Sequence, residues 1–335
     1  MVFSPNTRRR FLWESGTALA GACLAPARNF VRGAAALARG AGDGPASGSA
    51  PHIDFPGAAR DRIAIASYPF RQFITPRDPG DTGAPGAAPG KLELKDFAAH
   101  VVEKFKINKI EPWSVHFRSH EAQYLAEMRA AFLKAQVGVV NIAVDGQRSI
   151  YATDPAERER AVAESKSWID VAVAIGSPSV RTHLAEAKDS GPVIDRAAEC
   201  LRRVAEYGAS KNVVVNLEND NPVTEDAFFV AKLVATVGSP WLHALPDFAN
   251  SLTIMTVSQA YDAIDAMFAE AYNICHVKAL EMSGRGETFH VNMTKTFGVL
   301  KHHNFKGYCS MEFDSPGDPY AGTAELIKQT LKYLS

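Results

Sequence analysis

Four ionisable residues, each at the end of a short apolar run, have the types needed to hold a metal ion together. Glu218 closes the run NVVVNLE, Asp247 closes WLHALPD, His276 closes YNICH and Glu312 closes GYCSME. The spacings between them are 29, 29 and 36 residues. Three carboxylates and one imidazole form a mostly hard ligand set, which suits Mn²⁺ best and also accepts Mg²⁺, Co²⁺ or Zn²⁺. The quartet therefore predicts a site for one divalent ion.

Such a site favours one kind of first chemical step. Four protein ligands leave positions open for two substrate oxygens. A metal that holds adjacent carbonyl and hydroxyl oxygens stabilises an enediolate and lowers the barrier to removing the proton between them. A carboxylate beside the metal can act as the base. The prediction rests on all four residues jointly, because a single acid often caps a helix and a single histidine often ends a strand.

The elements that must position these side chains alternate between apolar strands and amphipathic helices from Arg62 onward. We predict strands at 62–67, 107–111, 137–143, 178–183, 212–218, 242–247, 272–276 and 307–312. We predict helices at 93–106, 119–136, 154–175, 191–210, 225–237, 256–270, 291–303 and 319–334. Eight strands, each followed by a helix, predict a single (β/α)8 barrel, an α/β fold whose active site lies where the strands end. An open doubly wound sheet would need a glycine-rich phosphate turn after the first strand, and SYPFR at 67–71 is not one.

The N-terminal segment does not belong to the predicted barrel. Residues 1–27 combine the basic start TRRRFL at 7–12 with a short apolar stretch and the sequence APA at 25–27, which is typical of an export signal. The paired arginines followed by Phe-Leu resemble a twin-arginine signal. We therefore expect the twin-arginine export machinery as a partner and a periplasmic or other extracytoplasmic location. A stable membrane anchor is not expected, because it needs about 20 apolar residues and this stretch is shorter.

Composition sets further limits on domains and partners. Residues 28–60, rich in Ala, Gly, Arg and Ser, are predicted to form a flexible linker before a catalytic barrel at 61–335. Residues 75–90 hold four prolines and four glycines, so this insertion is either disordered or a partly ordered lid. The net charge of −1 over 335 residues gives no field that favours nucleic acid. A neutral or weakly charged small molecule fits this charge better, and the sequence leaves a homo-oligomer open.

The cysteines give little evidence of a disulfide framework. Cys23 lies in the signal and could be a lipoprotein cysteine, although Ala20 is a poor match for the leucine usual there. The mature chain keeps Cys200, Cys275 and Cys309, an odd number that favours buried thiols. A bridge between Cys275 and Cys309 stays open, because each lies near the end of a neighbouring strand.

Around the quartet the sequence resembles the xylose-isomerase-like TIM barrels, also called the sugar phosphate isomerase/epimerase or AP-endonuclease-2 superfamily. The resemblance covers about residues 62–335 and is carried by NLEN at 216–219, PDFAN at 246–250, HVK at 276–278 and MEF at 311–313. In the family's ketose 3-epimerases the matching Glu, Asp, His and Glu bind one divalent ion, and the two glutamates move protons on opposite faces of the substrate. The resemblance therefore implies that Glu218, Asp247, His276 and Glu312 are the metal ligands. It also implies that Glu218 and Glu312 are the catalytic acid/base pair.

The expected substrate contacts depart from the 3-epimerase pattern. Those enzymes carry Asp-x-x-His after strand six, where this chain has Asn250, and an Arg soon after the strand-seven His, where this chain has Lys278. His-Val-Lys resembles the His-x-Lys-Asp of relatives that act on keto-glycosides, although Ala279 replaces the Asp. The shell around the substrate is therefore expected to differ from that of a simple ketose epimerase.

Other side chains at strand ends are expected to meet the substrate. Lys278 should face the same side as His276, two residues before it, and could polarise a carbonyl. Glu111 matches a recurrent glutamate of the family whose role the resemblance does not fix. The full expected set is His183, Arg181, Lys278, Asn250, Glu111 and Trp113. Tyr68, Phe70 and His116 could also stack on a sugar, while His183 and Arg181 could instead form a loop salt bridge.

The sequence as a whole predicts an exported, divalent-metal-dependent isomerase or epimerase of an unphosphorylated sugar or keto-sugar. If a leaving group departs from the next carbon, the same site makes the protein a keto-glycoside lyase or a dehydratase. A glycoside hydrolase would need only two carboxylates. An AP endonuclease would need the Asp-x-x-His motif that Asn250 interrupts, and basic patches for phosphate. A non-catalytic sugar-binding barrel is the remaining alternative.

Overall fold

Eight parallel strands form the centre of the computed structural model, which describes residues 50–76, 91–182, 184–220, 223–283 and 285–335. The strands are β1 (Ile63–Ala66), β4 (Lys109–Glu111), β5 (Gly138–Val139), β6 (Ser179–Arg181), β7 (Val214–Glu218), β8 (Leu242–Leu245), β9 (Ile274–Val277) and β12 (Tyr308–Met311). Their hydrogen bonds give the orders β5-β4-β1-β12-β9 and β6-β7-β8. Isolated bridges join Ala143 to Arg181 and Asp247 to His276, so the two sheets close into one ring.

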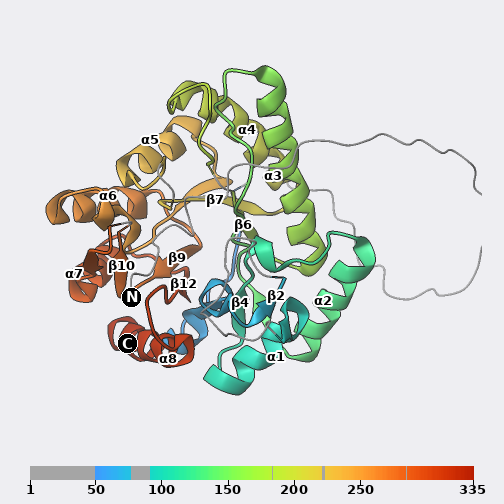
Figure 1. The fold of residues 1–335 in the computed structure, drawn as a ribbon, viewed down its shortest axis with the longest axis vertical. Coiled ribbons are helices and arrows are strands. Elements are labelled where there is room, and N and C mark those ends of the chain that lie inside the picture. Colours follow the sequence, from blue (N-terminus) through green and yellow to red (C-terminus); the bar gives the residue numbers. More distant parts are fainter. Residues whose placement is uncertain (1–49, 77–90, 183, 221–222, 284) are drawn as a thin grey trace, which may run out of the picture.

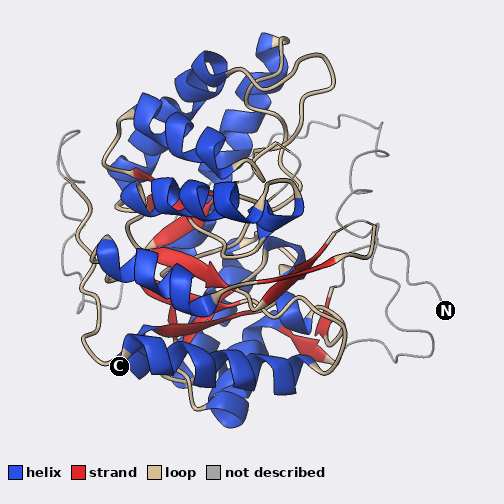
Figure 2. Cartoon of the chain, turned by 90° about the vertical axis from the view of Figure 1, so that its left-hand side faces the viewer, coloured by secondary structure: helices blue, strands red, loops and turns tan. Residues whose placement is uncertain are grey.

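A helix follows each of these strands and packs on the outside of the ring. The helices are α1 (Leu94–Phe105), α2 (Ala122–Lys134), α3 (Pro155–Ile175), α4 (Ile194–Lys211), α5 (Ala227–Val237), α6 (Val257–Ala269), α7 (Met293–His302) and α8 (Pro319–Leu334). They follow one another around the strands in chain order (Figures 1 and 2). The predicted (β/α)8 barrel is confirmed. None of the described helices is long and apolar enough to cross a membrane.

Short elements lie outside the barrel. β2 (Ile74–Thr75) pairs with β3 (Leu92–Glu93), and β10 (Leu280–Met282) forms an antiparallel hairpin with β11 (Thr288–His290). The 3₁₀ turns are η1 (Ala59–Arg62), η2 (Tyr68–Phe70), η3 (Ser114–His116) and η4 (Asn250–Thr253). Three of these turns, η2, η3 and η4, follow a barrel strand, so they form part of the rim of the site.

The inside of the barrel is polar below the site. Ser179 donates from Oγ to Asn141 Oδ1 at 2.7 Å, and Asn273 Nδ2 donates to Ser179 Oγ at 2.9 Å. These side chains are fully buried. Cys275 and Cys309 face the apolar layer beneath the helices instead, where they are free thiols with their sulfur atoms 3.8 Å apart. Cys200 is also buried and free.

The segment 50–58 closes the end of the barrel where the strands begin. Ile53 N donates to the Tyr272 hydroxyl at 3.1 Å, and this hydroxyl donates to Pro51 O at 3.0 Å. The Phe55 ring meets Tyr272 and Tyr308 edge-on, with ring centroids 5.5 Å and 5.9 Å apart. The linker predicted for residues 28–60 includes this segment, and within it the contacts of Pro51, Ile53 and Phe55 hold the chain against the barrel. The predicted signal 1–27, residues 28–49 and residues 77–90 of the insertion lie outside the described residues.

Candidate metal centre

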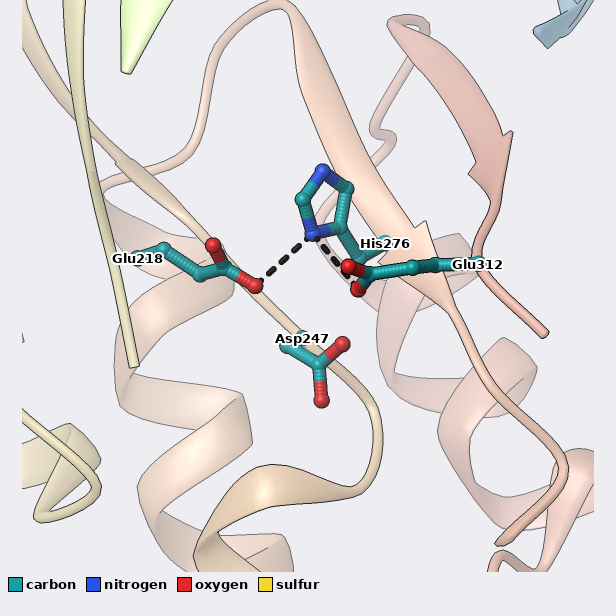
Figure 3. A group of neighbouring side chains, drawn as sticks. All are labelled: Glu218, Asp247, His276 and Glu312. Carbon is teal, nitrogen blue, oxygen red and sulfur yellow. Dashed lines mark hydrogen bonds and ion pairs between the residues drawn. The ribbon is translucent and has the colours of Figure 1, made fainter. Parts of the chain in front are cut away.

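The four predicted metal ligands meet at the end of the barrel where the strands finish. Glu218 ends β7, His276 lies in β9, Glu312 follows β12, and Asp247 lies two residues after β8. One ligand atom from each side chain lies within 4.8 Å of the others, and all four residues are buried. Glu218 and Glu312 approach from opposite sides, with His276 and Asp247 between them (Figure 3). These four residues could hold a metal ion.

His276 is surrounded by carboxylates on both sides of its ring. Its Nδ1 lies 2.7 Å from Glu218 Oε1 and 3.2 Å from Glu312 Oε2. Its Nε2 lies 3.0 Å and 2.9 Å from the two carboxylate oxygens of Glu111. Burial alone would lower the pKa of His276, but the charges of Glu111, Glu218 and Glu312 raise it well above its usual value. A proton on His276 therefore takes part of the role that a cation would have in this cluster.

Asp247 is held rigidly by backbone groups. Its Oδ1 accepts from Ala249 N at 2.9 Å and from Asn250 N at 2.8 Å. The Asn219 side chain also fixes the backbone of Asp247. Its Oδ1 accepts from Asp247 N at 2.7 Å, and its Nδ2 donates to Asp247 O at 3.1 Å. The second carboxylate oxygen, Oδ2, has no hydrogen-bond partner among the described residues and lies 3.4 Å from Lys278 Nζ. Asp247 thus directs one carboxylate oxygen toward the cluster.

Each glutamate of the expected acid/base pair has one buried cation beside it. Arg181 Nε lies 3.3 Å from Glu218 Oε2, and Lys278 Nζ lies 3.3 Å from Glu312 Oε2. Burial raises the pKa of Glu218 to about 7; the nearby Asp220 also raises it, while His276 and Arg181 act against the increase. Burial likewise raises the pKa of Asp247.

These observations fit a divalent cation. A pKa raised by burial means that the surroundings do not balance the negative charge of the carboxylate. A divalent cation would supply the missing positive charge. Asp247 Oδ2 accepts no hydrogen bond within the described part of the chain, so it is available to such an ion. The ligand atoms are oxygens and one imidazole nitrogen, the set that Mg²⁺ and Mn²⁺ accept. Glu218, Asp247, His276 and Glu312 would hold the ion.

A small cavity of about 10 Å³, the space of one water molecule, lies beside the cluster on the side of strands β1, β4 and β5. Its polar and aromatic lining consists of Tyr68, Glu111, Trp113, Asp145, Arg181, Asp220, His276 and Glu312. Trp113 Nε1 donates to Asp145 Oδ2 at 2.7 Å, and the Tyr68 ring meets the indole edge-on with centroids 5.0 Å apart. Arg181 Nη1 lies 2.8 Å from Asp145 Oδ1 and 3.2 Å from Asp220 Oδ2. The cavity therefore has an aromatic wall and an acidic wall.

The residues expected to contact substrate divide into two groups. Glu111, Trp113 and Arg181 line the cavity. Lys278 and Asn250 lie on the other side of the cluster, where Lys278 Nζ donates to Asn250 Oδ1 at 2.9 Å and lies 3.3 Å from Glu281 Oε2. Both of these side chains are almost fully buried. His183 lies outside the described residues.

Of the aromatic residues that could stack on a sugar, the structure places some in the core. Tyr68 lines the cavity beside Trp113, as stated above. Phe70 instead packs in the apolar core against Phe97, with ring centroids 5.7 Å apart. His116 is buried behind Trp113, edge-on with centroids 5.0 Å apart.

Several residues of the site were missed by the sequence prediction. Asp145 and Asp220 bind Arg181, Glu281 lies beside Lys278, and Asn141 donates to Glu111. Asp145 follows the predicted strand 137–143, and Asp220 lies two residues after Glu218. The rule that selects acids at strand ends would have found both aspartates. Nothing in the local sequence marks Glu281 or Asn141.

The fold and this arrangement of acids define a barrel of the xylose isomerase type. The family model described as xylose isomerase-like TIM barrel matches residues 99–335, and the chain belongs to this family. A comparison with curated protein sequences finds no significant match.

Solved structures with the same fold include several sugar epimerases. The E. coli 3-keto-D-glucoside 4-epimerase, in its apo form, is 11% identical with a TM-score of 0.58, covering 80% of this chain and 98% of that one. An L-ribulose 3-epimerase is 17% identical with a TM-score of 0.62, covering 81% and 95%. A xylose isomerase-like barrel from Mycobacterium smegmatis in complex with magnesium is 15% identical with a TM-score of 0.60, covering 83% and 98%. At these identities the likeness is one of fold.

Proposed function

We propose that this protein is a divalent-metal-dependent isomerase or epimerase that acts on an unphosphorylated sugar or keto-sugar. One observation carries the proposal: Glu218 and Glu312 approach one buried point from opposite sides, within 4.8 Å of the ligand atoms of Asp247 and His276. Two carboxylates on opposite sides of a substrate can remove a proton from one face and return one to the other. The sugar epimerases among the structures of the same fold support the proposal.

The chain's own residues would move the protons. The ion, when bound, supplies Lewis-acid stabilisation of the negative charge that develops on the carbonyl oxygen. One of the two glutamates takes the proton next to the carbonyl, and the other delivers a proton to the opposite face. In the metal-free cluster burial raises the pKa of Glu218 to about 7, and the positive charge of the ion would keep this carboxylate ionised, as a base must be near neutral pH. Arg181 and Lys278 hold the two carboxylates in place.

The cavity favours a neutral substrate. Its acidic wall contains Asp145 and Asp220, and both carboxylates lie within salt-bridge distance of Arg181. A phosphate entering this wall would meet carboxylates and a cation that is already paired, so binding would be opposed by like-charge repulsion. Hydroxyl groups can instead donate to these carboxylates, and Trp113 offers an apolar ring for a sugar face. An exported enzyme, as the N-terminal sequence predicts, would also meet sugars without phosphate.

A keto-glycoside lyase or dehydratase is the second candidate, and Lys278 favours it. The lysine replaces the arginine expected in ketose epimerases and lies 3.3 Å from Glu312 Oε2, almost fully buried. A cation next to the proton-donating carboxylate can stabilise negative charge on a departing oxygen. The first proton abstraction is the same in both candidates, and only the fate of the resulting carbanion differs.

Proton NMR in D₂O with free ketoses and with 3-keto-glucosides tests the proposal. We expect Mn²⁺-dependent exchange of a carbon-bound proton; exchange without cleavage identifies an isomerase or epimerase, and an enone or glycal product identifies a lyase. Glu312→Gln should reduce turnover by at least about a thousandfold, because an acid/base group and an anionic ligand are lost together. Glu325→Gln, on the exposed face of α8, is the matched control and should keep full activity. Retained activity in Glu312→Gln would overturn the assignment.

A further inference from the structure

We propose that Glu111 is a positioning residue of the metal centre: it accepts the Nε2–H of His276 and so commits Nδ1 of that ring to the metal ion. The inference rests on the metal-binding part of the proposed function. It gives Glu111 a role other than substrate binding, and it predicts which nitrogen of His276 is the ligand.

The contact between Glu111 and His276 is close and shielded from solvent. Glu111 ends β4 and is fully buried, and both of its carboxylate oxygens lie within 3.0 Å of His276 Nε2. Asn141 Nδ2 donates to Glu111 Oε1 at 2.7 Å, and Asn141 Oδ1 accepts from Ser179 at 2.7 Å. The polar interior of the barrel therefore holds the carboxylate in one orientation beneath the imidazole.

Hydrogen-bond chemistry then assigns the two nitrogens. An ionised carboxylate only accepts hydrogen bonds, so the nitrogen that faces Glu111 must carry the hydrogen. A neutral imidazole carries one hydrogen, which leaves the Nδ1 lone pair for a metal. Nδ1 faces carboxylates too, Glu218 Oε1 at 2.7 Å and Glu312 Oε2 at 3.2 Å. These two glutamates are expected ligands of the ion, so a bound ion takes the place of the hydrogen on Nδ1, while the hydrogen on Nε2 stays with Glu111. The two ring nitrogens point in different directions, so Glu111 contacts the ring on the side away from the four ligand atoms.

This arrangement predicts what the loss of Glu111 does. A carboxylate that accepts from a ligating histidine fixes its tautomer and ring orientation and raises its basicity, and removing such a partner typically lowers metal affinity 10- to 100-fold. Glu111→Gln keeps the size of the side chain but offers an amide that can also donate to Nε2. That contact would stabilise the tautomer with its hydrogen on Nδ1, which cannot bind the ion.

Mn²⁺ affinity of the full chain, measured by calorimetric titration or electron paramagnetic resonance, is the first test. We expect Glu111→Gln to weaken Mn²⁺ binding about 10- to 100-fold. Glu325→Gln is the matched control, because it makes the same change on the exposed face of α8, away from His276; its Mn²⁺ affinity should stay within about threefold of the wild type. Thermal melts of the metal-free proteins establish that both variants fold. An unchanged affinity in folded Glu111→Gln would overturn the inference.

The tautomer itself is the second test, and its readout comes from the wild-type protein. In wild-type protein labelled with ¹⁵N-histidine and loaded with Zn²⁺, two-bond ¹H–¹⁵N spectra should show a protonated Nε2 and a metal-bound Nδ1 for His276. The His276 signals are those missing from His276→Gln. A protonated Nδ1 in the Zn²⁺-loaded wild type would overturn the inference.

The outcome can be separated from that of the proposed function. Tight Mn²⁺ binding with the expected tautomer, but no sugar turned over, would support the role of Glu111 and overturn the proposed function. Sugar turnover with a Mn²⁺ affinity that Glu111→Gln does not change would support the proposed function and overturn the role of Glu111.

Discussion

Two buried histidines near the site have opposite electrostatic surroundings. His276 lies among carboxylates that raise its pKa well above the usual value against the effect of burial. For His116, burial and, as a smaller cause, the charge of Arg71 lower the pKa to about 3. Ser67 Oγ accepts from Trp113 N at 2.8 Å, which leaves its own hydrogen to donate to His116 Nδ1 at 2.9 Å. His116 is therefore a neutral residue that supports the aromatic wall.

Neutral His116 should make the protein sensitive to acid. Its pKa is near 6.5 in the unfolded chain and about 3 in the folded chain, so between these values only the unfolded chain binds the proton. Stability is therefore complete above pH 6.5 and falls as the pH drops, by about 1.4 kcal/mol per pH unit from this group. Urea unfolding at pH 7 and pH 5 should show that the wild type loses about 2 kcal/mol more than His116→Gln. Equal losses would show that His116 is accessible to protons in the fold.

Sequence reasoning at this scale found the residues but not their partners. Glu218, Asp247, His276 and Glu312 were expected together because each closes a strand, and the end of a strand is a local property. The contact of Glu111 with His276 joins β4 to β9 across the barrel. Such a contact exists only when the ring has closed, so the order of residues along the chain does not show it.

At the scale of elements, the expected strands and helices agree closely with the structure because their ends have local causes. Asp154 caps α3 by accepting from Ala156 N, Pro155 starts the helix, and Gly176 ends it with φ of +81°. The expectation of a helix at 154–175 rests on these same residues. The hairpin of β10 and β11 was not expected, because its strands are short and only partly buried and show no clear apolar pattern.

Two glycines in helices should respond to the same substitution in opposite directions. At Gly208 in α4, an added Cβ would lie 2.5 Å from Val213 O and 3.1 Å from Val215 Cγ2, so α4 could no longer pack closely on β7. Gly208→Ala should destabilise the fold by about 1–3 kcal/mol despite the better helix propensity of alanine. Gly298 in α7 has no atom within 4 Å of the added Cβ, and Gly298→Ala should stabilise by up to about 1 kcal/mol. Urea unfolding of both variants measures the two signs, and stabilisation by Gly208→Ala would contradict the packing argument.

At the scale of the whole molecule, the four candidate metal ligands connect distant parts of the chain. They come from β7, the segments after β8 and β12, and β9, which the unfolded chain does not hold together. Mn²⁺ at 100 times its dissociation constant should therefore stabilise the folded protein by about 2.7 kcal/mol, and a chelator should reverse this. Thermal melts should show a rise in Tm with Mn²⁺ for the wild type and little or none for Asp247→Asn. An equal rise in both would place the binding ion elsewhere.

The segment 50–58 also decides how the barrel would be oriented if it were held at residue 50. This segment contacts Tyr272 and Tyr308, at the end of the barrel where the strands begin, while the acidic cluster lies where the strands end. The point of attachment and the opening of the site are thus on opposite ends of the barrel axis. A protein shortened to begin at residue 50 and immobilised there through a tag on a bead or a sensor chip would present the cavity to the bulk solution. Sugars could then be screened on the immobilised protein without steric blocking by the support.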